Sequence, residues 1–147
     1  MAPPSGLLLD TDVIAELRSP SPHPAVTGFL HRRRHFRIFV SALSLGELHS
    51  LGRRNEHFPD LEAWLHEFAE RFGPNILSVD ADVAVAWAPL ADHADVALAD
   101  SLIAATALHR GLAVVSGNTE PYRRLAVPAI NPWTAGEQPA GPPGVVP

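Results

Sequence analysis

The sequence predicts an α/β fold in which a parallel sheet of four to five strands lies between two layers of helices. Two observations predict this architecture. Short apolar runs without polar alternation recur along the chain, as expected of strands buried on both faces. Longer segments with helical periodicity separate these runs, which is the order of parallel βαβ units. The length of 147 residues suits one domain.

The strands are predicted at the apolar runs. The first run, Gly-Leu-Leu-Leu, stops abruptly at Asp10. Later runs are similarly short and are bounded by glycine, proline or polar residues, which mark turns. The predicted strands are residues 6–9, 36–40, 76–79 and 112–115, with a short fifth strand at 129–131.

The helices are predicted where apolar side chains recur three and four residues apart. One of them has two possible starts, Ser41 or Ser44, because Ser44 and Glu47 have the spacing of a capping box. Gly111 stands where a helix C-cap glycine belongs. The predicted helices are residues 11–18, 25–34, 41 or 44 to about 53, 61–72, 81–90 and 98–110.

The domain is expected to cover residues 1–134, and residues 135–147 are predicted to be a disordered tail because they are rich in proline and glycine. No apolar run is long enough to span a membrane. The start of the chain lacks a basic region before its apolar run, unlike a secretory signal. A cytoplasmic protein is therefore expected.

Two residue types are missing, and each absence excludes chemistry. The chain has no cysteine, which excludes disulfides, cysteine-ligated metals and thiol nucleophiles. All eleven basic residues are arginine, so a P-loop, a Schiff-base enzyme and a protein kinase are excluded. The formal charge of -5 argues against non-specific binding of nucleic acid.

Acidic residues gather where ligands bind in such sheets, at the carboxyl ends of the strands. Asp10 ends the first strand, Glu47 lies about two helical turns after the second, and Asp100 opens the helix before the fourth. Crowded carboxylates repel one another, and a divalent cation with oxygen ligands relieves that repulsion. The residues therefore indicate a metal-dependent phosphoryl hydrolase.

Each acid also has a structural interpretation. Asp10 could only cap the following helix, and the two interpretations have even weight for this residue alone. Glu47 could complete the capping box, and Asp100 could only favour the positive end of a helix dipole. Asp12 is interpreted as a first-turn acid. The shared location of these residues favours a functional site.

Four motifs in order resemble PIN-domain toxins of the VapC type over residues 6–133. They are Leu7-Leu8-Leu9-Asp10-Thr11-Asp12, Ser41 to Leu48, Ala99-Asp100-Ser101-Leu102-Ile103-Ala104, and Gly111 to Asn118. Asn131-Pro132-Trp133 is similar to a frequent ending in that family. The resemblance implies a three-layer α/β/α domain with strand order 3-2-1-4-5.

The resemblance also implies a function and its residues. It implies a Mg²⁺- or Mn²⁺-dependent endoribonuclease, the toxin of a type II toxin–antitoxin pair, that cleaves structured RNA such as transfer or ribosomal RNA. Asp10, Glu47 and Asp100 would bind the metal directly or through water. The expected partners are a VapB-like antitoxin, the RNA substrate and a second copy of the chain.

The fourth acidic position of the family departs from its pattern. Asn118 stands where many PIN domains have an acid. Many toxins of the VapC type also have Asn there, followed three residues later by Asp, and this chain has Pro121 at that later position. Gly117 stands where many relatives have arginine. Glu120 is the candidate replacement for the missing carboxylate, and Ser116 and Thr11 are expected to support the site.

Arginines provide the expected phosphate contacts, because guanidinium groups pair bidentately with phosphate. Arg123 and Arg124 are the candidates nearest the site. Two further clusters are residues 32–37 and Arg53-Arg54, and each of the three clusters has the alternative role of a solvated helix end.

Two other functions compete with the toxin. Asp10-Thr11-Asp12 also resembles the nucleophile motif of haloacid-dehalogenase-type phosphatases, but those enzymes use a lysine that this chain lacks. The other alternative is a catalytically weak or inactive PIN domain that binds an antitoxin or RNA, which the incomplete fourth position favours.

Overall fold

The structure, a computed structural model, describes residues 3–54 and 60–136. A five-stranded sheet forms its centre, with all neighbouring strands parallel and the order β3-β2-β1-β4-β5. The strands are β1 (Gly6–Leu9), β2 (Arg37–Ser41), β3 (Ile76–Leu77), β4 (Ala113–Val115) and β5 (Ala129–Ile130).

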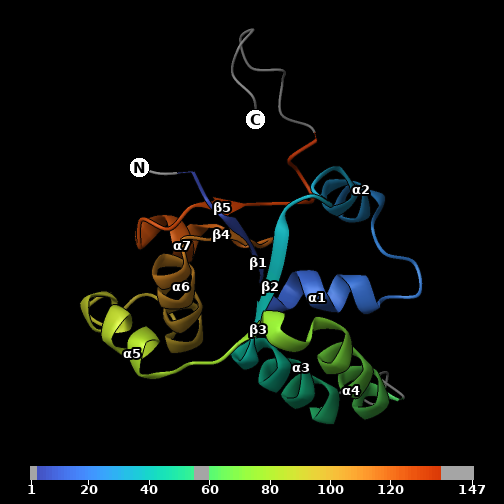
Figure 1. The fold of residues 1–147 in the computed structure, drawn as a ribbon, viewed down its shortest axis with the longest axis horizontal. Coiled ribbons are helices and arrows are strands. Elements are labelled where there is room, and N and C mark those ends of the chain that lie inside the picture. The colour runs from blue at the N-terminus through green and yellow to red at the C-terminus, as the bar shows by residue number, and fades with distance from the viewer. Residues whose placement is uncertain (1–2, 55–59, 137–147) are drawn as a thin grey trace, which may run out of the picture.

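Helices cover both faces of this sheet (Figure 1), as the sequence predicts. The first four helices lie on one face and the last three on the other. They are α1 (Thr11–Arg18), α2 (Pro24–Arg32), α3 (Ala42–Arg54), α4 (Leu61–Phe72), α5 (Ala81–Trp87), α6 (Leu98–Arg110) and α7 (Glu120–Arg124). Short 3-10 turns follow α4 at Gly73–Asn75 and α5 at Ala88–Leu90.

The central strand β1 supplies both cores because successive side chains of a strand point to opposite faces. Leu7 and Leu9 belong to the core beneath α1 to α4. Leu8, which is 0% exposed, belongs to the core beneath α6 and α7. Burial of each leucine stabilises the fold by roughly 1.5–3 kcal/mol, so β1 and the residue that follows it have a well-defined position.

Most predicted elements are confirmed, with shifted ends. The third strand is shorter than predicted, covering only residues 76–77. The helix after β2 begins at Ala42, and the hydroxyl oxygen of Ser41 accepts the N–H of Leu43 at 3.1 Å. The capping-box start at Ser44 is wrong, because Ser44 lies inside α3. Gly111 has φ of +67° at the end of α6, as its predicted capping role requires.

The helix α7 is absent from the sequence prediction. Its local signals are Pro121 in the first turn and the Glu120–Arg124 pair four residues apart. Five residues carry too little periodicity to reveal a helix. The helix lies beside α6, on the face that α5 to α7 cover (Figure 1).

The predicted tail falls mainly on residues 137–147, which lie outside the described part of the chain. Ala135 is described and packs against the core that contains Leu7. No helix within residues 3–54 and 60–136 has the length and apolar character needed to cross a membrane.

Candidate active site

The site lies at the carboxyl end of β1, between the ends of its neighbours β2 and β4. The backbone N–H of Asp10 donates to the carbonyl of Val115 at 2.9 Å, which joins the end of β1 to the end of β4. Asp10 is 9% exposed, and its Oδ1 accepts the N–H of Thr11 at 2.8 Å. Asp10 therefore caps α1, as one interpretation of the sequence had it, and also lies at the predicted site.

Thr11 connects the start of α1 to α3. Its hydroxyl donates to Glu47 Oε1 at 2.8 Å, and its oxygen lies 3.0 Å from the hydroxyl oxygen of Ser44. The Glu47 carboxylate is therefore hydrogen-bonded to the residue next to Asp10. It does not cap the start of α3, because Glu47 lies inside that helix.

Asp100 lies in the first turn of α6. Burial raises the pKa of its carboxyl group above the usual range, and the negative charges of Asp10 and Glu47 raise it further. This electrostatic coupling indicates that the three predicted acids belong to one region of negative potential.

Asp12 belongs to the same negative region. Burial and then the charge of Asp10 raise the pKa of Asp12 to about 6, although its Oδ2 accepts the N–H of Gly117 at 2.8 Å. A side chain on Gly117 would place its Cβ 2.8 Å from that oxygen and 2.9 Å from the ring of Trp133. The absence of an arginine here therefore has a steric reason in this fold.

Ser116 and Asn118 form a tight turn after β4. The buried Ser116 hydroxyl oxygen accepts the N–H of Asn118 at 3.0 Å and lies 3.2 Å from its carbonyl oxygen, to which the hydroxyl donates. Ser116 thus shapes the turn, and the Asn118 residue is exposed beside Asp100.

Tyr122 is part of the site and is missing from the sequence prediction. Its hydroxyl donates to Asp10 Oδ2 at 2.7 Å, and the residue is 0% exposed. Burial and the neighbouring charge of Asp10 raise the pKa of the Tyr122 phenol, which keeps it a hydrogen donor. The contact spans 112 positions of the chain, and no local pattern could reveal it.

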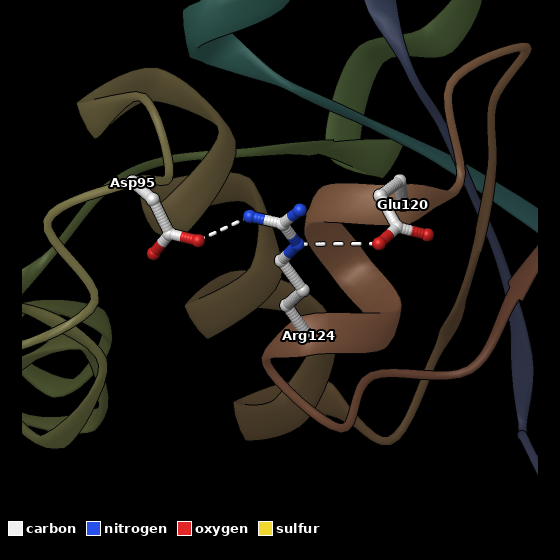
Figure 2. A network of polar contacts seen from close by, with 3 residues as sticks. All are labelled: Asp95, Glu120 and Arg124. Carbon is white, nitrogen blue, oxygen red and sulfur yellow. Dashed lines mark hydrogen bonds and ion pairs between the residues drawn. The ribbon is translucent and has the colours of Figure 1, made fainter.

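Arg124 lies between two carboxylates (Figure 2). Its Nε donates to Glu120 Oε1 at 3.2 Å, and its terminal Nη1 donates to Asp95 Oδ2. Glu120, the predicted replacement carboxylate, is thus paired with a cation. Arg123 lies in the same helix and is exposed.

Two hollows flank the acids. A groove of about 620 Å³ runs along α3, where Glu47, Leu51, Arg54 and Val79 are among its lining residues. A smaller cavity of about 320 Å³ lies between the α5–α6 link and α7. Its lining includes Asp95, Asp100, Asn118, Glu120 and Arg124. Glu47 and Asp100 therefore open onto different hollows.

A divalent cation fits the chemistry of these side chains. The carboxylates offer hard oxygen ligands. Burial and the charges of Asp10 and Glu47 raise the pKa of Asp100, and a bound cation would relieve the repulsion between these charges. Within the described ranges, no three histidine or acidic side chains converge as a complete ligand set. Mg²⁺ commonly keeps several waters and uses only one or two direct carboxylates, so such a set is not required.

Comparison with known proteins identifies a family. The PIN domain family matches residues 7–128. The VapC ribonuclease Y4jK of Sinorhizobium fredii is 30% identical over 139 residues, which cover 86% of this chain and 97% of that protein. Toxin FitB of Neisseria gonorrhoeae is 32% identical over 137 residues, which cover 86% of this chain and 98% of that protein.

The chain is also similar to solved structures. The crystal structure of FitAcB from Neisseria gonorrhoeae has a TM-score of 0.70 and 31% identity, covering 86% of this chain and 98% of that one. The VapBC2 structure from Rickettsia felis has a TM-score of 0.71 at 18% identity, a likeness of fold. The described strand order 3-2-1-4-5 and the three layers are the ones that the family resemblance implied.

Proposed function

Because the chain belongs to the PIN-domain family and is similar to its VapC-type toxins, we propose that it is a metal-dependent endoribonuclease and the toxin of a type II toxin–antitoxin pair. The observation that carries the proposal is the placement of Asp10, Glu47 and Asp100 by three elements at the carboxyl edge of one sheet, with Thr11 hydrogen-bonded to both Asp10 and Glu47. Burial and the charges of the other two acids raise the pKa of Asp100, in line with this placement. Such a negative centre suits a divalent cation.

Asp10, Glu47 and Asp100 would hold Mg²⁺ or Mn²⁺, directly or through water. When bound, the cation supplies positive charge to a scissile phosphate and makes water a better nucleophile. The chain's own contribution is orientation: Thr11 holds Glu47, and the Thr11 N–H and the Tyr122 hydroxyl hold the two oxygens of Asp10. Ser116 keeps Asn118 beside Asp100.

The proposed substrate is a structured RNA of the transfer or ribosomal class. A negative centre repels an RNA backbone, so arginines near the site are needed to attract phosphate. Both predicted contacts, Arg123 and Arg124, are exposed, but Arg124 already binds two carboxylates, so Arg123 is the one we propose to meet phosphate.

The proposed partners are an antitoxin and a second copy of the chain. The groove along α3 supports the first of these, because its lining includes Glu47 and the exposed apolar residues Leu51 and Val79. An antitoxin segment that covered these side chains could present a cation to Glu47. The alternative is an inactive PIN domain that only binds such a partner. We propose the cytoplasm as the location of the toxin and its antitoxin.

Inducible expression with mapping of cellular RNA ends tests the proposal. Wild type is expected to arrest growth and to create new RNA 5′ ends at a small set of sites. Asp100→Ala should create none of them, and Asp92→Asn, an exposed acid of the α5–α6 link, should behave as wild type. Equal cleavage by Asp100→Ala would refute the proposed centre, and no cleavage by any variant would favour the binding module.

A further inference from the structure

We propose that Tyr122 is a positioning residue that holds Asp10 in the orientation needed to bind a divalent cation. The inference rests on the proposed function only in taking Asp10 as a cation ligand. It assigns a role in this site to a residue on α7, a helix far along the chain from β1.

The hydroxyl of Tyr122 has a defined partner. It donates to Asp10 Oδ2 at 2.7 Å, a short distance typical of an O–H donor and a carboxylate acceptor. The Tyr122 ring packs in the core with Leu8, Leu125 and Val127 and is 0% exposed. A buried phenol hydroxyl without a partner is costly, so this bond is part of the folded state.

The bond also completes the support of Asp10. Its other oxygen, Oδ1, accepts the N–H of Thr11. Donors from α1 and α7 therefore each bind one oxygen of the carboxylate, which restricts the side-chain torsions of Asp10. A carboxylate has about four acceptor positions, so each oxygen keeps capacity for a cation.

The position of Tyr122 is itself fixed from both sides. The N–H of Val127 donates to the Tyr122 carbonyl at 2.9 Å, closing the turn that leaves α7. Arg124, one helical half-turn away, joins Glu120 of the same helix and Asp95 of the link before α6 (Figure 2). Helix α7 thus connects Asp10 to the segment that leads to Asp100.

The test measures cation binding rather than cleavage. Tyr122→Phe keeps the ring and removes only the hydroxyl. Mn²⁺ titration by calorimetry is expected to give a dissociation constant about 10-fold higher than wild type, as for loss of other groups that orient metal ligands. The matched control is Thr106→Val, which removes a buried hydroxyl that donates to the Leu102 carbonyl in α6 and should leave Mn²⁺ affinity within about twofold.

A second measurement needs no substitution of Tyr122, because it is the only tyrosine of the chain. Protein labelled with ¹³C at tyrosine Cζ should give one resonance. Mg²⁺ should shift it along a saturating curve, and Asp10→Asn should both move the resonance and abolish its response to Mg²⁺.

Three results would overturn the inference: Mn²⁺ affinity of Tyr122→Phe within twofold of wild type, a tyrosine resonance that ignores Mg²⁺ at saturation, or no Mn²⁺ binding by wild type. Failure of the ribonuclease proposal is separate. If wild type binds Mn²⁺ and Tyr122→Phe binds it more weakly, but wild type cuts no RNA, the role of Tyr122 stands and the ribonuclease proposal fails.

Discussion

The hydroxyl of Thr11 donates to Glu47 Oε1 at 2.8 Å and so joins the first turn of α1 to α3. Thr11 directly follows Asp10, and its N–H already binds the Asp10 carboxylate. One residue therefore holds two of the three acids of the proposed centre. Its substitution should disturb both the position of Glu47 and the function.

Thr11→Val keeps the shape of the side chain and removes the hydroxyl. We expect cleavage of RNA to fall about 10-fold, as for loss of other groups that orient metal ligands, and stability to fall by about 1 kcal/mol. Single-turnover cleavage and urea unfolding measure the two effects. The control is Thr27→Val in α2, whose hydroxyl binds only the Pro24 carbonyl at 3.2 Å. Cleavage by Thr11→Val at the wild-type rate would contradict a role for Thr11 in orienting the acids of the site.

Stability should depend on pH through Asp12. Its pKa in the fold is about 6, above the ordinary 3.8, so the native state holds a proton that the unfolded chain releases. Between roughly pH 4 and 6 the native state binds more protons, and stability therefore falls as pH rises. Asp12→Asn still offers an oxygen to the Gly117 N–H and should flatten this dependence.

The measurement for Asp12 is thermal unfolding in chelator at closely spaced pH values between 4 and 7. The difference in melting temperature between Asp12→Asn and wild type should grow with pH and level off above about pH 6. A constant difference across that range would contradict the raised pKa.

Gly117 and Gly46 predict opposite effects of the same substitution. Gly117→Ala would crowd Asp12 Oδ2 at 2.8 Å and the Trp133 ring at 2.9 Å, and we expect it to destabilise the fold by about 1–3 kcal/mol. Gly46 lies inside α3 with open space at its Cβ, so Gly46→Ala should stabilise by about 0.5–1 kcal/mol. Chemical unfolding measures the free energy of unfolding of both variants. An unchanged value for Gly117→Ala would contradict the predicted clash and show that the Trp133 ring can move aside at little cost.

Arg123 and Arg124 should differ in their effect on RNA binding. Both are exposed, but Arg124 binds Asp95 and Glu120. Arg123→Gln should therefore weaken RNA binding and reduce its salt dependence by about one phosphate contact, while Arg124→Gln should change that salt dependence less. Binding of RNA to the Asp10→Asn protein across a salt series measures this. If both substitutions reduce the salt dependence of RNA affinity equally, the expected difference is contradicted, and Arg124 must release Asp95 and Glu120 to bind phosphate.

The strength of the hydrophobic pattern explains which helices and strands could be predicted from the sequence. The apolar run of β1 and the spacing of α6 carry strong signals because these elements are buried in the cores. Strand β3 pairs at two positions, Ile76 and Leu77. The predicted strand runs on to Val79 because this apolar, β-branched residue follows the run after a single small residue, Ser78. Pattern alone cannot detect where a neighbouring strand ends.

The acids proposed for the site stand out in the sequence, whereas the side chains that hydrogen-bond to them do not. Asp10, Glu47 and Asp100 follow strands or open helices, which local sequence reveals. Tyr122 reaches Asp10 across 112 positions, and Arg124 reaches Asp95 across 29. Such contacts depend on tertiary packing, which a single sequence does not encode as a local pattern.

Cleavage of RNA by purified protein tests the central claim most directly. Wild type with Mg²⁺ or Mn²⁺ should cut a structured RNA at defined positions, chelator should stop it, and Asp92→Asn should match wild type. Asp10→Asn, folded as judged by circular dichroism, should leave the RNA intact. Equal cleavage by Asp10→Asn would contradict the account, because the reaction would then come from another centre or from a contaminant.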